Sequence, residues 1–251
     1  MRYALLSDIH ANHEALSAVL AAVSNQRIDR IFCLGDMIGY GAEPQACLEQ
    51  LAAHDAVMVA GNHAAGCIGQ LELNWFNDAA KAALLWTRDQ LSVADLDMLR
   101  RLPLTVTEDP VTLAHSGRKN PEQFESLVDL AQMVETLAAC RTPRCCIGHT
   151  PIPLLVEYEV EHCRIVRVLS QPNDLSDVVL VDDQPSRRYL LNPGSVGQPR
   201  DGDPRASDMV VDTDRQPLHV NRIAYDIAGA QRKIRQAGLP ALFADRLAIG
   251  R

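Results

Sequence analysis

The hydrophobic positions of the first 150 residues alternate between short continuous runs and stretches with helical spacing. Continuous apolar runs bounded by polar or turn-forming residues are typical of buried strands, whereas apolar residues three and four apart indicate amphipathic helices. The pattern predicts strands at 2–6, 30–34, 55–60, 111–115 and 144–148. It predicts helices at 12–25, 44–53, 74–101 and 126–139, with the third interrupted near Ser92, a residue suited to cap a helix.

The pattern changes after residue 150. The β-rich segments are 152–169, 187–192, 207–213 and 216–225, and the last 25 residues have helical spacing. Strands that alternate with helices, followed by a run of strands, predict two β-sheets rather than one. Because the chain shows neither a low-complexity linker nor a repeat of fixed period, we expect residues 1–251 to form a single domain.

Composition narrows the possible functions. The chain is 47% hydrophobic and 22% charged, as in ordinary globular proteins. Its net charge of −8 argues against a broad surface for duplex nucleic acid, because neutralising phosphates requires a basic face. The seven cysteines include no C-x-x-C pair, which argues against a disulfide framework and a structural zinc site. With neither a secretory leader nor an apolar run of membrane-spanning length in the sequence, we expect a cytoplasmic protein without membrane contact.

A polar side chain follows each of the five early apolar runs. In chain order these residues are Asp8 and His10, Asp36, Asn62 and His63, His115, and His149. The carboxyl ends of strands in an open α/β sheet form the edge where ligands bind. Taken singly, such a residue is more often a helix cap, a turn residue or a core histidine. Five occurrences at five strand ends favour a metal site, because carboxylate, amide and imidazole groups are typical ligands of transition metals.

The same positions carry a resemblance to a known family. Six segments resemble, in their order, the motifs of the calcineurin-like metallophosphoesterase superfamily and most closely its small bacterial phosphodiesterase-like branch: SDIHAN, LGDMIGYG, AGNHAAG, LAHSG, IGHTP and LNPGSVGQPR. The resemblance implies an α/β (α+β) fold, a four-layer αββα sandwich of two mixed β-sheets flanked by helices. It also implies a centre for two metal ions between loops at one edge of the sandwich.

Carried over by position, the resemblance implies a role for each polar residue. The implied metal ligands are Asp8 and His10 for the first ion, Asn62, His115 and His149 for the second, and Asp36 bridging both. His63 would be the acid or transition-state stabiliser beside the metals, with a pKa near the working pH. In this scheme the two cations activate a water for attack on phosphorus, so no serine or cysteine nucleophile is required.

Three positions depart from the family pattern. Pro151 stands where a second histidine normally completes the first metal site, and because its side chain has no ligand atom we expect this site to bind metal more weakly. Ala64 and Gly39 stand where acidic residues are common, which removes carboxylates that help to fix the orientation of the His63 imidazole.

Further residues near the motifs are candidates for substrate contact. Arg200 and Arg118 would meet a substrate phosphate if their side chains face the metal edge, although a solvated surface charge is the more common role for an arginine. Trp75, Phe76 and Trp86 have helical spacing, and we expect them to pack in the core rather than to stack on a base.

The sequence therefore predicts a metal-dependent phosphoesterase that hydrolyses a phosphodiester or a nucleotide-type phosphoanhydride. Two alternatives stay open: a phosphomonoesterase or protein phosphatase-like enzyme, and a degenerate module that binds metal or nucleotide with little turnover because Pro151 replaces a ligand. The histidines favour manganese or iron over magnesium, with zinc or nickel as further options. The expected partner is a small phosphorylated substrate, and a homodimer is compatible with the sequence.

Overall fold

The computed structural model describes residues 1–170, 179–180, 186–213 and 217–251. One sheet consists, from edge to edge, of β3 (Val57–Met58), β2 (Arg30–Cys33), β1 (Arg2–Leu6), β11 (Ala206–Asp212), β12 (Pro217–Ile223) and β9 (Val179–Leu180). The second sheet consists of β4 (Thr105–Glu108), β5 (Val111–Ala114), β6 (Arg144–Cys146), β10 (Arg187–Pro193), β7 (Pro153–Glu159) and β8 (Arg164–Leu169). Both sheets contain parallel and antiparallel neighbours, which confirms the prediction of two mixed sheets.

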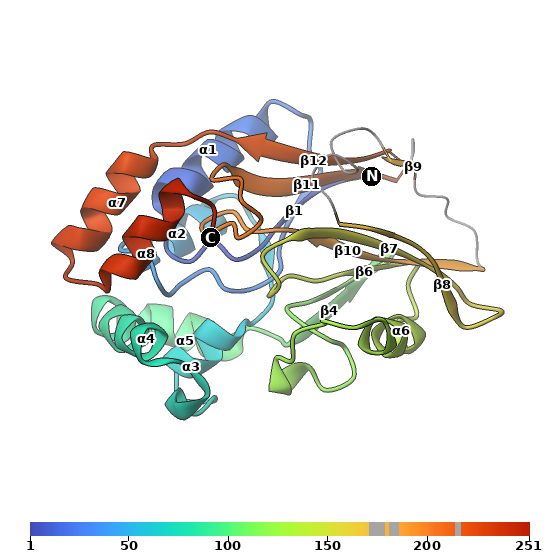
Figure 1. Cartoon of the computed structure of the whole chain (residues 1–251), viewed down its shortest axis with the longest axis horizontal. Helices are drawn as coiled ribbons and strands as arrows, with labels where there is room; N and C mark the ends of the chain where they lie inside the picture. Colours follow the sequence, from blue (N-terminus) through green and yellow to red (C-terminus); the bar gives the residue numbers. More distant parts are fainter. Residues whose placement is uncertain (171–178, 181–185, 214–216) are drawn as a thin grey trace.

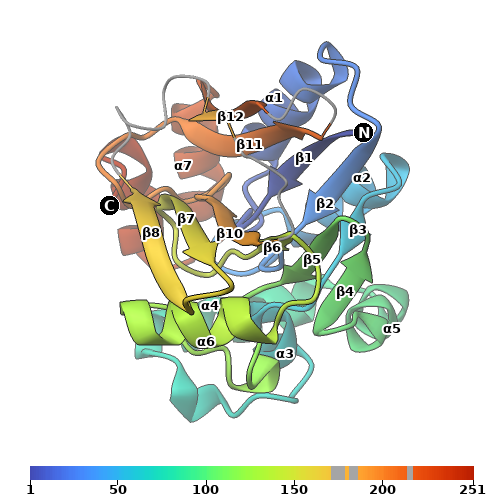
Figure 2. The same ribbon diagram turned by 90° about the vertical axis from the view of Figure 1, so that its right-hand side faces the viewer.

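Helices cover the outer faces of the sheets (Figure 1). Those that pack with the first sheet and its edge are α1 (His13–Ser24), α2 (Pro44–Ala53), α3 (Asn62–Cys67), α4 (Asp78–Gln90) and α5 (Val93–Arg101). The helix α7 (Ile227–Gln236) packs against α1 and against the C-terminal helical elements. The outer face of the second sheet is covered by α6 (Leu130–Ala139), as Figure 2 shows. The remaining helical elements are η1 (Leu73–Trp75), η2 (Pro121–Gln123), α8 (Ala241–Asp245) and η3 (Arg246–Ala248).

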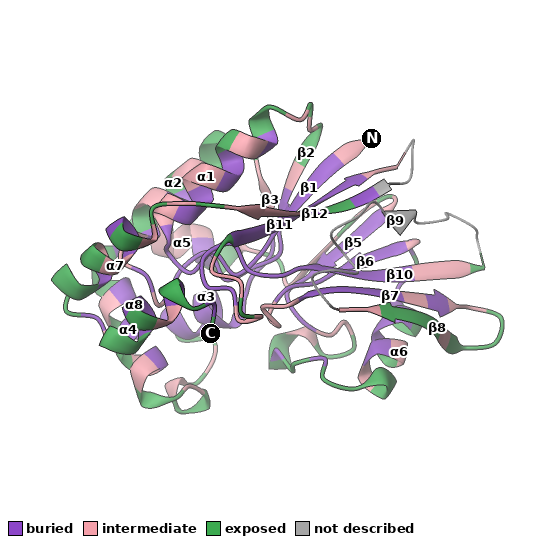
Figure 3. Cartoon of the chain, turned by 45° about the horizontal axis from the view of Figure 1, so that its top comes forward, coloured by how far each residue is buried: buried purple, intermediate pink, exposed green. Residues whose placement is uncertain are grey.

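Alternation along β1 divides its side chains between two cores. Tyr3 and Leu5 lie between the two sheets, in the same cluster as Leu191 of β10. Ala4 and Leu6 point the other way and pack against the helices of the first sheet. Successive residues of a strand face opposite sides of its sheet, so a strand that is buried on both faces reads as the continuous apolar run seen in the sequence. Figure 3 shows this burial, with exposed residues concentrated on the outer sides of the helices.

Capping residues and strand pairing determine where several of the helices and strands begin and end. The predicted break at Ser92 is confirmed, because Ser92 caps α5 and forms a capping box with Asp95. The helix predicted at 126–139 begins only at Leu130, since Asp129 caps it and exchanges hydrogen bonds with Gln132. The strand predicted at 55–60 is wrong in length: β3 pairs with β2 only at Val57–Met58. The strand β4 was not predicted, because its four residues, TVTE, include only one hydrophobic residue and show no clear alternation of hydrophobic and polar positions.

The directions of the strands bring the polar strand ends to one edge. The strands β1, β2 and β3 are parallel neighbours in the first sheet, and β5, β6 and β10 are parallel neighbours in the second. Carboxyl ends of parallel strands share an edge of the sheet, so the polar residues that follow them gather there.

The cysteines are spread over both sheets and their helices. All seven are unpaired, and only Cys163 is exposed. Among the described residues, no helix combines the length and the apolar character that crossing a bilayer requires.

Candidate metal centre

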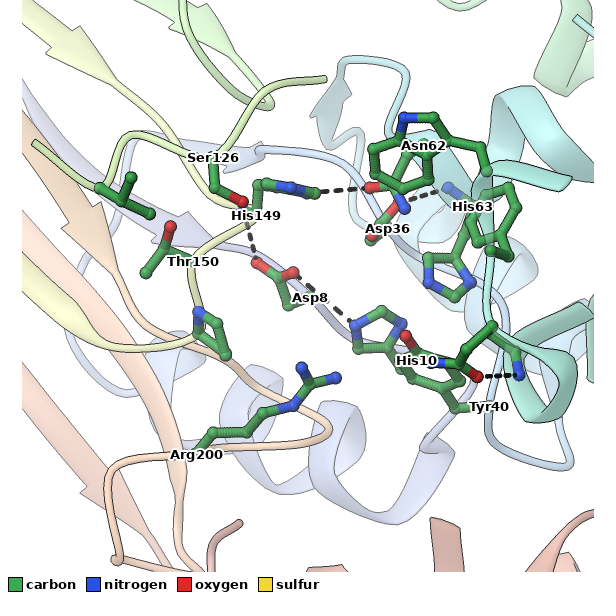
Figure 4. Close-up of a pocket in the computed structure, with 16 residues that line it drawn as sticks. Asp8, His10, Asp36, Tyr40, Asn62, His63, Ser126, His149, Thr150 and Arg200 are labelled. Atoms are coloured by element: carbon green, nitrogen blue, oxygen red, sulfur yellow. Dashed lines mark hydrogen bonds and ion pairs between the residues drawn. The ribbon is translucent and has the colours of Figure 1, made fainter. Parts of the chain in front are cut away.

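The polar residues at the strand ends surround one cavity of about 300 Å³ (Figure 4). Asp8 and His10 follow β1, Asp36 follows β2, and His149 follows β6. The first turn of α3 supplies Asn62 and His63 directly after Gly61. His115, which follows β5, lies behind the cavity wall, where it contacts Asn62 and Asp36. The structure therefore brings together all seven positions that were predicted from the sequence.

Asp36 belongs to two groups of potential metal ligands. One group consists of Asp36, His10 and His63, and the other of Asp36, His115 and His149. Within each group the ligand atoms lie within 4.8 Å of one another. A carboxylate has two oxygens, so Asp36 can face both groups at once, as a residue that bridges two ions must do.

The second group is tightly connected. The Nε2 atom of His115 lies 3.2 Å from Oδ2 of Asp36 and 3.0 Å from Oδ1 of Asn62. The Nδ1 atom of His149 lies 2.9 Å from the same oxygen of Asn62 and 3.2 Å from Nε2 of His115. The Nδ1–H of His115 donates to the backbone carbonyl of Leu34 at 2.6 Å, which directs its Nε2 atom towards the group.

Asp8 connects the segments that follow β1 and β6. Its Oδ2 atom accepts hydrogen bonds from the Ser7 hydroxyl at 2.5 Å and from the backbone N–H of His149 at 3.0 Å. Its Oδ1 atom lies 3.7 Å from Nε2 of His10. Asp8 therefore faces His10, the partner with which the resemblance places it at the first metal, although its oxygens lie outside the compact group of Asp36, His10 and His63.

The backbone is strained where these side chains converge. Asp8, His10, Asp36, Tyr40 and His149 all have φ between 50° and 64°, a region that residues other than glycine seldom adopt. Such conformations cost free energy and persist where the surrounding structure holds them, often at functional sites. The strain supports a functional origin for this arrangement.

The backbone at position 61 passes so close to the carboxylate of Asp36 that the position requires a glycine. A Cβ atom at Gly61 would lie 2.1 Å from Oδ1 of Asp36, so no larger residue fits without moving this carboxylate.

Burial keeps three of the imidazoles neutral. Burial lowers the pKa of His63 to about 4 and that of His149 to about 3, and it holds the pKa of His10 well below the usual value. A neutral imidazole has a lone pair on one nitrogen, which is the form that binds a metal. The expectation that the pKa of His63 lies near the working pH is therefore wrong, because the residue is only 2% exposed.

The carboxylates respond differently to the same burial. Burial raises the pKa of Asp8 to about 6. In Asp36 burial acts in the same direction, but His115 and His63 outweigh it and hold the pKa below its usual range. The pKa of His115 rises to about 9 despite its burial, because the Asp36 carboxylate stabilises the imidazolium. A cation that binds here would replace this proton.

Packing, rather than a carboxylate, orients His63. Its ring lies 4.4 Å from the ring of Tyr40 and 5.4 Å from that of Phe76, measured between centroids. Its Nδ1 atom is buried and has no hydrogen-bond partner among the described residues. A Cβ atom at Gly39 would lie 2.2 Å from this nitrogen, so an acidic residue at position 39 would need a different arrangement of the ring.

The two arginines proposed for substrate contact lie in different places. Arg200 lines the cavity, and its guanidinium lies 5.7 Å from the centre of the Tyr40 ring. Its Nη2 atom donates to Gln198, whereas its buried Nε has no hydrogen-bond partner among the described residues. Arg118 does not line the cavity: its Nε donates to the carbonyl of Ala139 at the end of α6. A direct contact between Arg118 and a phosphate in this cavity does not fit the structure.

The expectation of core packing is wrong for Trp75 but is confirmed for Phe76, which is half-buried and packs against the core beside α3. Trp75 ends the short helix η1 and is 47% exposed, and Phe76 follows it in extended conformation. Both residues line the cavity. Trp86 is half-buried and packs against the cluster formed by the C-terminal helices, as expected of a structural residue. Hydrophobic spacing did not reveal that the helix starts only at Asp78, where Asn77 caps it.

The donor set fits transition metal ions. It combines buried carboxylates, an amide oxygen and neutral imidazoles, and histidine nitrogens favour transition metals over magnesium.

Comparison with known proteins agrees with this geometry. The profile of the calcineurin-like phosphoesterase superfamily domain matches residues 1–216. An uncharacterized protein from Methanocaldococcus jannaschii is 36% identical over 99% of this chain and 98% of its own length. The crystal structure of a metallophosphoesterase from Sphaerobacter thermophilus is 36% identical with a TM-score of 0.85, and all of both chains is covered. A hypothetical protein from Pyrococcus horikoshii OT3 shares the fold, with 18% identity, a TM-score of 0.76 and coverage of 100% and 98%.

The family profile covers the strand ends that build the cavity, including every residue of the two ligand groups. The chain belongs to the calcineurin-like phosphoesterase superfamily and is a metal-dependent phosphoric ester hydrolase.

Proposed function

We propose that this hydrolase acts on a phosphodiester or a nucleotide-type phosphoanhydride and that it uses two transition metal ions, manganese or iron. The observation that carries the proposal is that Asp36 belongs to both groups of potential metal ligands. A centre of two ions suits the attack of water on phosphorus, because both the attacking and the leaving oxygen need stabilisation.

The residues of the chain divide into two sets of ligands. Asp8 and His10 would hold one ion and Asn62, His115 and His149 the other, with Asp36 contacting both. When bound, the ions supply positive charge that activates a water and neutralises the phosphate oxygens. The orientation of the ligands comes from the protein, through the hydrogen bonds of His115 to Leu34 and of Asp8 to Ser7.

His63 is the proposed hydrogen-bond donor to the leaving oxygen. Because its pKa is lowered to about 4, the imidazole is neutral near pH 7 and contributes one ring N–H rather than an imidazolium. The rings of Tyr40 and Phe76 hold it at the edge of the cavity. A neutral donor stabilises developing charge on the leaving oxygen without having to be protonated first.

Arg200 is the proposed phosphate ligand on the protein side. Arg200 lines the cavity together with Pro151, and its backbone N–H donates to the carbonyl of Pro151 at 3.5 Å. Pro151 is the position at which this chain lacks the metal-binding histidine of the family pattern. A guanidinium offers several N–H groups in one plane and binds phosphate oxygens in pairs. It would therefore supply positive charge on the side where the protein offers fewer metal ligands.

A cavity that extends beyond the ligands favours a substituted phosphate over a small monoester. Its walls include Trp75, Phe76 and Val128, which suit an organic group better than a phosphate oxygen. This observation supports a diester or an anhydride as the substrate. A monoesterase and a binding module without turnover predict different outcomes in the test.

The test compares hydrolysis of bis(p-nitrophenyl) phosphate and p-nitrophenyl phosphate in the presence of Mn²⁺. We expect faster turnover of the diester and a loss of about 100-fold in His63→Ala. Faster turnover of the monoester would favour the phosphomonoesterase. If the wild type turns over neither ester with any divalent metal, while Pro151→His gains activity, the chain is a binding module.

A further inference from the structure

Trp75 is an exposed aromatic residue at the mouth of the proposed active site. Almost half of its surface, 47%, is accessible, although tryptophan is normally well buried. Its side chain lines the same cavity as Asp36 and His149. Trp75 belongs to neither ligand group, and beyond forming part of the cavity wall it has no role in the proposed hydrolysis.

The indole ring is fixed before any ligand binds. It packs edge-on against Phe76, with 5.1 Å between the ring centroids. Phe76 in turn lies 5.4 Å from the ring of His63 and against α3, where a Cβ atom at Gly66 would come within 2.7 Å of it. The turn is closed by a hydrogen bond of 3.0 Å from the backbone N–H of Trp75 to the carbonyl of Glu72. An ordered aromatic surface of this kind loses little entropy on binding.

Trp75 lies at a suitable distance from the ligand groups to contact an aromatic ring attached to a phosphate that is bound there. The centroid of Trp75 lies 6.3 Å from that of His149, whose Nδ1 atom belongs to the second group. The other large aromatic residues that line the cavity are Phe76 and Tyr40. Phe76 packs against Trp75 and His63, and the ring of Tyr40 is already covered by Phe243 at 4.5 Å and by the Arg200 guanidinium. Among the aromatic residues described in this cavity, Trp75 is therefore the best placed to accept a new planar partner.

We propose that Trp75 stacks on the base of a nucleotide-like substrate whose phosphate lies at the Asp36 centre. This inference rests on the proposed function and names its substrate class, a phosphate ester or anhydride that carries a planar aromatic group. Base–aromatic stacking tolerates different bases, so Trp75 selects for the presence of a base rather than for its identity.

The test compares the affinity for adenosine 5′-monophosphate with that for ribose 5-phosphate, which lacks the base, by calorimetry in the presence of Mn²⁺. The wild type is expected to bind the nucleotide about tenfold more tightly, and Trp75→Ala to bind both probes equally. Trp75→Phe should retain most of the preference. The matched control is Leu85→Ala, which truncates an apolar side chain of α4 that is 45% exposed and lies outside the cavity lining.

A second measurement detects the contact itself. The chain has two tryptophans, so in Trp86→Phe the fluorescence comes from Trp75 alone, and the nucleotide should quench it while ribose 5-phosphate should not. Equal affinities of the wild type for the two probes, or an unchanged preference in Trp75→Ala, would overturn the stacking. Failure of this inference can be told apart from failure of the proposed function. If Trp75 does not stack on the base, the protein still hydrolyses the diester. If the protein does not hydrolyse the diester, it still binds adenosine 5′-monophosphate more tightly than ribose 5-phosphate.

Discussion

The carboxylate of Asp36 accepts a hydrogen bond of 2.9 Å from the backbone N–H of His63. This contact joins the end of β2 to the first turn of α3 and so couples the shared ligand to the proposed leaving-group donor. A carboxylate at a helix N-terminus is also stabilised by the unpaired N–H groups there. The orientation of Asp36 is therefore set by the fold as well as by the metals that it would bind.

Gly61→Ala tests how closely the backbone must approach Asp36. The new Cβ atom would lie 2.1 Å from Oδ1 and 2.5 Å from the backbone N of Asp36, so both the carboxylate and the backbone that carries it must shift away from their present positions. We expect Mn²⁺ affinity, measured by calorimetry, to fall about 10- to 100-fold. Gly69→Ala is the control, because its φ of +79° makes the substitution cost about 1 kcal/mol of stability while nothing lies within 4 Å of the new Cβ. Equal metal affinity in the two variants would contradict the predicted displacement.

Arg200→Gln and Arg118→Gln separate the two arginines. The first removes a cation from the cavity lining, whereas the second changes a residue that bonds to Ala139 outside the lining. Losing a charge-assisted hydrogen bond costs about 1.5–3 kcal/mol, so KM for the diester should rise about 10- to 100-fold in Arg200→Gln. Steady-state kinetics should show no change in Arg118→Gln. A larger effect in Arg118→Gln would mean that substrate binds elsewhere.

Asp208 makes the stability depend on pH. It is fully buried, accepts one hydrogen bond from Asn221, and has a second oxygen without a partner among the described residues. Burial raises its pKa from 3.8 to about 6. The pKa of Asp208 is therefore higher in the folded than in the unfolded state, so the protonated carboxyl group adds to the free energy of unfolding. This contribution is complete below about pH 4 and is lost as the pH rises through about 6.

Asp208→Asn should therefore stabilise the protein at pH 7.5, by about 1–3 kcal/mol in urea unfolding, and have little effect near pH 4. The control is Asp97→Asn, which changes a surface ion pair with Arg100 and should shift stability by less than about 0.5 kcal/mol. The same stabilisation at both pH values would show that removing the charge is not the cause.

Pro151→His tests the departure from the family pattern. Pro151 lines the cavity beside Arg200, so a histidine there would add a ligand near the first group. We expect Mn²⁺ affinity to rise about tenfold at the weaker site. Pro121→His is the control, because it adds a histidine at η2, outside the cavity lining. An unchanged Mn²⁺ titration in Pro151→His would mean that position 151 lies too far from the ions.

The sequence predicted the positions that gather at the cavity better than their surroundings. Asp8, Asp36 and His149 could be found because each follows a continuous apolar run, and strand direction brings such ends together. Trp75 was misplaced because apolar spacing does not reveal where Asn77 starts the helix. The lowered pKa of His63 depends on burial by distant segments, and the position of Arg118 depends on the end of α6. Neither leaves a signal in the local sequence.

The most direct test of the shared ligand is the Mn²⁺ content per chain after equilibrium dialysis. The wild type should hold about two ions, His149→Ala about one, and Asp36→Asn fewer than one, because Asp36 belongs to both groups. Circular dichroism would confirm that each variant is folded. If Asp36→Asn holds as many ions as the wild type, Asp36 is not the residue that joins two metal sites, and the account of this centre is wrong.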